Sequence, residues 1–153
     1  MAQVYAARAI VPRMLERGHG YIVNVASAAG LLSQIGDSAY SATKHASVGF
    51  TESLAINYGD DGIKVSVVCP QAVATRMIGM EDDSGAKEGG FRGNDVDGIL
   101  SAEAVADIIV DQALAGRFMI LTHPNVTNYI QRKSGDYDRW IGGMRKFRRS
   151  LSD

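Results

Sequence analysis

Apolar and polar positions at the start of the chain repeat with the period of a helix. From about Ala2 to Glu16 the apolar residues recur at three- and four-residue spacing, as expected of a helix that buries one face. Gly18 is expected to end this helix, because glycine readily adopts the left-handed conformation found at helix C-termini. No capping residue precedes the pattern, so it begins as if in the middle of a helix. We therefore expect a further segment upstream of Met1.

The rest of the chain alternates between short apolar runs and longer helical stretches. Strands are expected where apolar and β-branched residues cluster in short runs, at 21–26, 63–69 and 118–121. Helices are expected from 38 to about 58, from 101 to about 115, and from 125 to about 149, with Ser134-Gly135 as the place for a break. The first run is apolar on both sides, as in a buried parallel strand. This alternation predicts an α/β fold with a parallel sheet and helices on both faces.

Three strands are fewer than a complete doubly wound domain has. Each strand–helix unit takes roughly 30 residues, so a sheet of six or seven strands needs about 200 residues or more. We therefore expect residues 1–153 to form a single partial domain. Within it, the glycine-rich and charged stretch 71–100 predicts a long loop, and 125–150 a carboxyl-terminal helical region.

Composition and charge exclude several classes of protein. Apolar residues make up 46% of the chain and charged residues 22%, which is typical of a soluble globular domain and not of a disordered chain. With 16 basic and 17 acidic residues, the net charge of −1 gives no indication of binding to nucleic acid or membranes. The single cysteine, Cys69, excludes an internal disulfide and fits a cytoplasmic location. The three histidines have no carboxylate or cysteine at ligand spacing, so we expect no metal site.

Two features of the last helical region allow more than one interpretation. The apolar stripe that includes Trp140 is most simply packing, on the fold or against a partner, with a cap on the substrate side as the alternative. The basic cluster Arg145-Lys146-Arg148-Arg149 ends a helix, where cations complement the helix dipole. We prefer that interpretation to phosphate or nucleic-acid binding.

Tyr40 and Lys44 are four residues apart, so they lie on one face of the helix expected from residue 38. A phenol is a poor acid or base at neutral pH, and a nearby cation favours its phenolate form, which suits the pair to proton transfer. Alone, the pair is common and uninformative. Ser27, however, follows the first expected strand, and ligands of open α/β sheets bind beyond the carboxyl ends of the strands. Ser27 is therefore placed to hydrogen-bond a substrate oxygen, with a turn cap as the alternative.

Three segments around these residues resemble the short-chain dehydrogenase/reductase family, in the order and at the spacing of that family. They are residues 20–30 with Ser27, residues 40–44 (Tyr-Ser-Ala-Thr-Lys), and residues 67–75, which begin Val-Val-Cys-Pro. The resemblance covers roughly residues 1–121. It implies that the chain is the carboxyl-terminal part of a Rossmann-type doubly wound parallel sheet.

The resemblance also implies the roles of individual residues. Tyr40 would give or take the proton at the carbonyl or hydroxyl of the substrate, Lys44 would assist it and bind the nicotinamide ribose, and Ser27 would orient the substrate oxygen. The cofactor would be NAD or NADP, bound by Tyr40 and Lys44 and by residues after the second strand, namely Pro70, Val73 and Thr75. The loop 71–100 would cover a small alcohol or carbonyl substrate. A homo-oligomer would form through the helices at 2–16 and 38–58, with no nucleic-acid or membrane partner.

The sequence departs from the family pattern in two respects. Gln71 stands where the family usually has glycine after the proline. The glycine-rich loop that places the cofactor pyrophosphate at a helix N-terminus has no counterpart, because the glycines between 85 and 93 follow no strand. We therefore expect a truncated chain of an NAD(P)-dependent oxidoreductase acting on CH–OH groups. The alternative is a non-catalytic remnant that serves as an interaction or dimerisation module.

Overall fold

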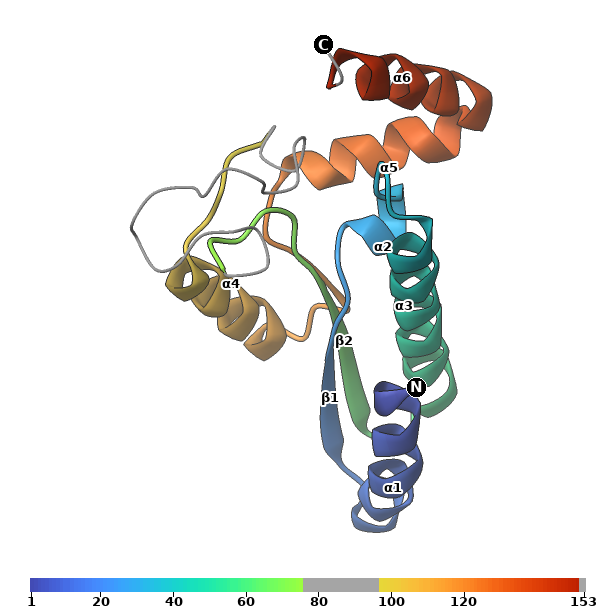
Figure 1. The fold of residues 1–153 in the computed structure, drawn as a ribbon. Coiled ribbons are helices and arrows are strands. Elements are labelled where there is room, and N and C mark those ends of the chain that lie inside the picture. The colour runs from blue at the N-terminus through green and yellow to red at the C-terminus, as the bar shows by residue number, and fades with distance from the viewer. Residues whose placement is uncertain (76–96, 152–153) are drawn as a thin grey trace.

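The structure, a computed structural model, describes residues 1–75 and 97–151 and contains a three-stranded parallel sheet (Figure 1). The strands lie side by side in the order β1 (Gly20–Val25), β2 (Ile63–Cys69) and β3 (Met119–Leu121). Ile22 is paired with Val65 in the first ladder, and Val68 with Ile120 in the second. The predicted α/β fold and parallel sheet are confirmed.

Helices cover both faces of this sheet. In the part of the chain that the structure describes they are α1 (Ala2–Arg17), α2 (Ala29–Leu32), α3 (Ser38–Tyr58), α4 (Ala102–Leu114), α5 (Asn125–Gly135) and α6 (Tyr137–Ser150). Helices α1 and α3 lie on one face and α4 on the other, whereas α5 and α6 lie beyond the carboxyl ends of the strands, next to α2 (Figure 1). None of the described helices is both long and apolar enough to span a bilayer.

The helix boundaries follow from the residues that flank them. Helix α1 ends at Gly18, whose left-handed backbone (φ 72°) lets its N–H reach carbonyl oxygens of the last turn. Asp37 caps α3, because its carboxylate accepts a hydrogen bond from the backbone N–H of Tyr40 at 2.8 Å. Ser101 caps α4 in the same way. These ends agree with the boundaries predicted from the sequence.

One element differs from the sequence expectation: the stretch after β1, where the sequence predicts no helix, contains the short helix α2. The break predicted at Ser134-Gly135 is confirmed, because α5 ends at Gly135 and Asp136 separates it from α6. Asp136 causes the break, because its extended backbone leaves the helix and its carboxylate accepts from the N–H of Arg139 at 2.9 Å, which caps α6.

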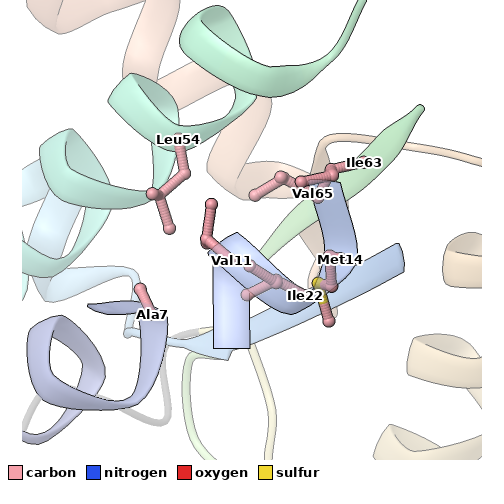
Figure 2. Packing of buried hydrophobic residues seen from close by; sticks show 7 residues of the cluster. All are labelled: Ala7, Val11, Met14, Ile22, Leu54, Ile63 and Val65. Atoms are coloured by element: carbon pink, nitrogen blue, oxygen red, sulfur yellow. The ribbon is translucent and has the colours of Figure 1, made fainter. Parts of the chain in front are cut away.

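The main hydrophobic core lies between the sheet and helices α1 and α3 (Figure 2). Its buried members come from α1, β1, α3 and β2 and are Ala7, Val11, Met14, Ile22, Leu54, Ile63 and Val65. Full burial of an aliphatic side chain contributes roughly 1.5–3 kcal/mol, so this cluster holds both helices on the sheet. A second cluster lies nearer the carboxyl ends of the strands and consists of Ala26, Val48, Val67 and Cys69.

β1 is one of the two edge strands of the described sheet, and one of its faces is open. Val23 and Val25 are 41% and 54% exposed, whereas Ile22, which points to the opposite face, is buried under α1 and α3. Helix α4 packs beside β3 and meets β1 at Tyr21, whose hydroxyl donates to the carbonyl of Ala113 at 2.7 Å. The expectation that this strand is buried on both faces is therefore wrong for the described residues.

Candidate active site

The segments that carry the predicted site residues meet at the carboxyl end of the sheet. The backbones of β1 and β2 stay paired beyond the strands, because the N–H of Ala26 donates to Val68 O and the N–H of Ala28 to Pro70 O, each at 2.8 Å. Ser27 and Pro70 are therefore neighbours at the edge where open α/β sheets bind their ligands.

The Ser27 side chain takes part in the turn that follows β1. Its hydroxyl oxygen accepts a hydrogen bond from the N–H of Ala29 at 3.1 Å, which fixes the start of α2. A hydroxyl has one proton and two lone pairs, so this bond leaves the proton available for a second partner. The cap and the substrate contact, weighed as alternatives from the sequence, are chemically compatible.

Helix α2 rests directly on the backbone of α3. A Cβ atom added at Gly30 would lie 2.6 Å from the carbonyl oxygen of Lys44, closer than real Cβ atoms come, and 3.0 Å from a methyl group of Val48. Only glycine permits this approach. The contact sets the turn that carries Ser27 beside the turn of α3 that carries Lys44.

The environment of Cys69, the last residue of β2, is a second indication that Ser27 and Lys44 lie near each other. Burial raises the pKa of this thiol to about 11, although a backbone hydrogen bond from Ser27 and the positive charge of Lys44 act in the opposite direction. The Ser27 backbone is therefore within hydrogen-bond reach of the sulfur, and Lys44 is near enough for its charge to act on it. Ser27, Lys44 and the carboxyl end of β2 thus share one neighbourhood, with an ammonium as its local charge.

Tyr40 and Lys44 lie on one face of the amino-terminal half of α3, as the sequence predicts. The Lys44 ammonium nitrogen is 5.4 Å from the centroid of the Tyr40 ring, and both side chains are half-buried. At this separation the cation interacts favourably with the face of the ring. The structure thus places an ammonium beside the phenol, as the sequence predicts.

The segment after β2 leaves this neighbourhood in an extended conformation. Val73 forms a parallel bridge with Leu100, and the N–H of Ala74 donates to Leu100 O at 2.8 Å. Pro70 and Val73 are half-buried and Thr75 is exposed. The structure thus brings Pro70 to Ser27, whereas Val73 and Thr75 lie farther along the segment. The larger part of the loop predicted at 71–100 lies outside the described residues.

A polar cluster that the sequence did not reveal lies at the same end of the sheet. The Asp97 carboxylate accepts from Asn125 Nδ2 at 2.7 Å and from the Tyr129 hydroxyl at 3.0 Å. Burial alone would raise the pKa of the Asp97 carboxyl, but hydrogen bonds from Asn125, Gln71 and Tyr129 outweigh it and lower the pKa. The nearby His123 acts in the same direction. Gln71, the departure from the family pattern, therefore has a partner in this cluster.

Comparisons with known proteins agree with this geometry. Residues 1–84 match the family model described as short chain dehydrogenase. The 1-deoxy-11-beta-hydroxypentalenate dehydrogenase of Streptomyces exfoliatus is 36% identical over 142 residues, which cover 92% of this chain and 49% of that protein. A solved short chain dehydrogenase/reductase from Burkholderia phymatum, in complex with NAD, aligns with a TM-score of 0.68 and 28% identity over 88% of this chain and 54% of that chain.

A second solved structure, the short-chain dehydrogenase from Sphingobium yanoikuyae in complex with NADPH, has the same fold. It aligns with a TM-score of 0.65 and 22% identity, over 96% of this chain and 50% of that one. The chain thus spans about half the length of these proteins. The family match includes Ser27, Tyr40, Lys44 and the segment through Thr75, whereas α4, α5 and α6 lie beyond it.

Proposed function

Because the chain belongs to the short-chain dehydrogenase family, we propose that it carries the proton-transfer residues of an oxidoreductase that interconverts an alcohol and a carbonyl compound with NAD or NADP. The observation that carries the proposal is the packing of α2 on α3, which sets Ser27 and Lys44 together at the carboxyl end of the sheet. The relative from Streptomyces exfoliatus, a dehydrogenase of a hydroxylated carboxylate by its name, supports the same reaction class.

In this proposal each residue acts on the substrate oxygen or on the group next to it. The Tyr40 hydroxyl exchanges a proton with that oxygen, and the Lys44 ammonium, 5.4 Å from the ring centroid, offsets the negative charge that the phenolate gains. The Ser27 hydroxyl, which keeps its proton after accepting from Ala29, donates to the same oxygen and orients it. The nicotinamide, when bound, supplies or accepts the hydride.

The described residues fit the nicotinamide end of such a cofactor. Its ribose would be held by Lys44 and Tyr40, and its ring would lie along the segment from Pro70 past Val73, which is fixed on one side by β1 and on the other by Leu100. Pyrophosphate binding needs backbone N–H groups of a glycine-rich turn at a helix start. Among the described residues, neither the turn between β1 and α2, Ala26-Ser27-Ala28, nor the turn between β3 and α5, Thr122-His123-Pro124, contains glycine, so the proposal concerns the nicotinamide end. The protein from Burkholderia phymatum, solved with NAD, supports the cofactor class.

Measurement of coenzyme binding and of carbonyl reduction by the purified 153-residue chain tests the proposal. Wild-type protein should quench or enhance the fluorescence of NADH or NADPH saturably, and should oxidise it in the presence of a ketone panel. Tyr40→Phe should lower kcat by at least about 100-fold, the usual contribution of a general acid or base. Tyr5→Phe is the matched control, because it removes the same hydroxyl from the exposed surface of α1.

Each other outcome has a definite meaning. Coenzyme-dependent turnover that is equal in wild type and Tyr40→Phe would overturn the role of Tyr40. Failure to bind either reduced coenzyme would overturn the enzymatic proposal for this chain and favour the remnant that serves as an interaction module.

A specific observation supports that second candidate, the interaction module. Apolar side chains are exposed on α1 and α3, namely Tyr5, Ile10, Leu15 and Ile56. Sedimentation velocity then decides, since a homo-oligomer through α1 and α3 should dissociate on Ile56→Glu.

A further inference from the structure

A groove of about 510 Å³ lies between the loop that joins α2 to α3 and the helix pair α5 and α6. Leu32, at the end of α2, and Ile35 of the loop line one side, and Trp140, Ile141 and Met144 line it from α6. Its volume is within the range of small-molecule sites, roughly 300–1,000 Å³. The loop runs between Ser27 and Tyr40 in the chain, but neither these two residues nor Lys44 line the groove.

The two sides of the groove are held together by specific contacts. The Lys133 ammonium of α5 donates to the carbonyl oxygen of Leu31 in α2 at 2.5 Å. The rings of Tyr129 in α5 and Trp140 in α6 are 6.4 Å apart between centroids and inclined at 44°, an attractive aromatic arrangement. Asp136 caps α6 and fixes the turn between the two helices. Trp140 therefore has a defined place in the wall of the groove.

The charged side chains that line the groove are all basic. Lys133 lies on α5, and Arg145 and Arg148 lie on α6, while none of the described lining residues is acidic. The half-buried Lys133 ammonium is also 5.5 Å from the Tyr137 ring centroid. A strip of apolar and aromatic surface beside three cations complements a ligand with a bulky apolar part and one anionic group.

We propose that this groove binds an amphipathic organic anion, a carboxylate attached to an apolar skeleton. The carboxylate lies toward Lys133 and Arg145, and the skeleton lies against Trp140, Ile141 and Met144. Packing and the helix dipole explain why aromatic and basic residues occur in α6, but they do not require a groove between α6 and the loop. A lipid surface fits less well, because Trp140 packs on Tyr129 and Met144 is half-buried within the groove instead of lying on an outward face.

The fluorescence of Trp140 tests the proposal directly, because Trp140 is the only tryptophan in the chain. Decanoate, titrated as monomer, should change the Trp140 emission saturably, whereas decan-1-ol, which has the same chain length and no charge, should bind about tenfold more weakly. Arg145→Gln should weaken decanoate binding about five- to tenfold and leave decan-1-ol binding unchanged. Arg149→Gln is the matched control, since Arg149 is an exposed arginine on the same helix that does not line the groove.

Three outcomes would overturn the proposal: no saturable change with decanoate, equal affinity for decanoate and decan-1-ol, or equal effects of Arg145→Gln and Arg149→Gln. Emission that responds only to anionic phosphatidylserine vesicles, and not to monomeric decanoate, would also overturn it and assign the surface to lipid. Ile141→Glu provides a second variant, because it adds a negative charge to a half-exposed position and should abolish decanoate binding. All of these titrations omit coenzyme, so their failure leaves the proposed oxidoreductase function untouched.

Discussion

Replacement of Gly30 by alanine should loosen the contact that builds the candidate site. The added Cβ would lie 2.6 Å from the Lys44 carbonyl oxygen and 2.8 Å from its carbonyl carbon. Both atoms belong to the backbone of α3, so neither can swing aside as the end of a side chain would. Helix α2 must move away from α3, and the turn that carries Ser27 moves with it.

The expected cost follows from the size of the overlap. Insertion of a methyl group into a closely packed contact typically costs about 1–3 kcal/mol, and alanine recovers roughly 0.5–1 kcal/mol of it by stiffening the unfolded chain. We therefore expect Gly30→Ala to lower the free energy of unfolding by about 1–2 kcal/mol.

Gly49 offers a matched control in α3, the helix on which α2 rests. A Cβ at Gly49 would meet no atom within 4 Å, and the residue lies inside the helix, where alanine is favoured over glycine by roughly 0.8–1 kcal/mol. Gly49→Ala should therefore stabilise the protein, and the two variants should differ by about 2–3 kcal/mol in urea denaturation followed by far-UV circular dichroism. If Gly30→Ala is as stable as Gly49→Ala, then α2 does not rest on the Lys44 backbone, and the placement of Ser27 beside Lys44 is wrong.

Three other positions give predictions of the same kind. Thr51→Val should lower the free energy of unfolding by about 1–3 kcal/mol, because the Asn24 Nδ2 group loses the buried hydroxyl to which it donates at 3.0 Å. Urea denaturation measures this, with Thr43→Val at an exposed position of the same helix as the control. Equal effects of the two substitutions would contradict the reasoning. Cys69, fully buried and with a pKa of about 11, should react with a thiol reagent at pH 8 only as fast as the protein unfolds. Rapid labelling of native protein would refute this. The thiol ionises near pH 9 in the unfolded chain but only near pH 11 in the folded protein, so the free energy of unfolding should fall as pH rises from about 9 to 11. Asp97 has a lowered pKa, so wild type should exceed Asp97→Asn in stability above pH 3.8 and lose that advantage as pH falls through the folded pKa; a difference that does not change with pH would rule this out.

The parts of the fold that could be predicted from the sequence are those set by neighbours in the chain. Apolar periodicity and capping residues such as Gly18, Asp37 and Ser101 act over one or two helical turns, so they locate α1, α3 and α4 closely. Helix α2, with four residues, is too short to show a period. Exposure of one face of β1 could not be predicted, because it depends on which other segments pack on that face and not on the residues of the strand itself.

The same distinction applies to the site. Tyr40 and Lys44 could be paired from helical spacing alone, and Ser27 from its place after a strand. The cluster around Asp97 could not be predicted, because Asn125 and Tyr129 are 28 and 32 residues away in the chain. The groove beside α6 escaped prediction for the same reason, although the basic and aromatic residues that line it stood out in the sequence.

The contacts that build the candidate site do not involve the open face of β1. Ser27 and Lys44 are brought together by Gly30, by the β1–β2 hydrogen bonds and by the core under α3, and each of these contacts is complete within the described residues. Val23 and Val25 are exposed on the side of β1 away from α3. Apolar cover on that side would bury these side chains and add to stability, but it would touch neither Gly30 nor α3. The arrangement of the proton-transfer residues is therefore expected to depend on the contact between α2 and α3, and not on what covers the open face of β1.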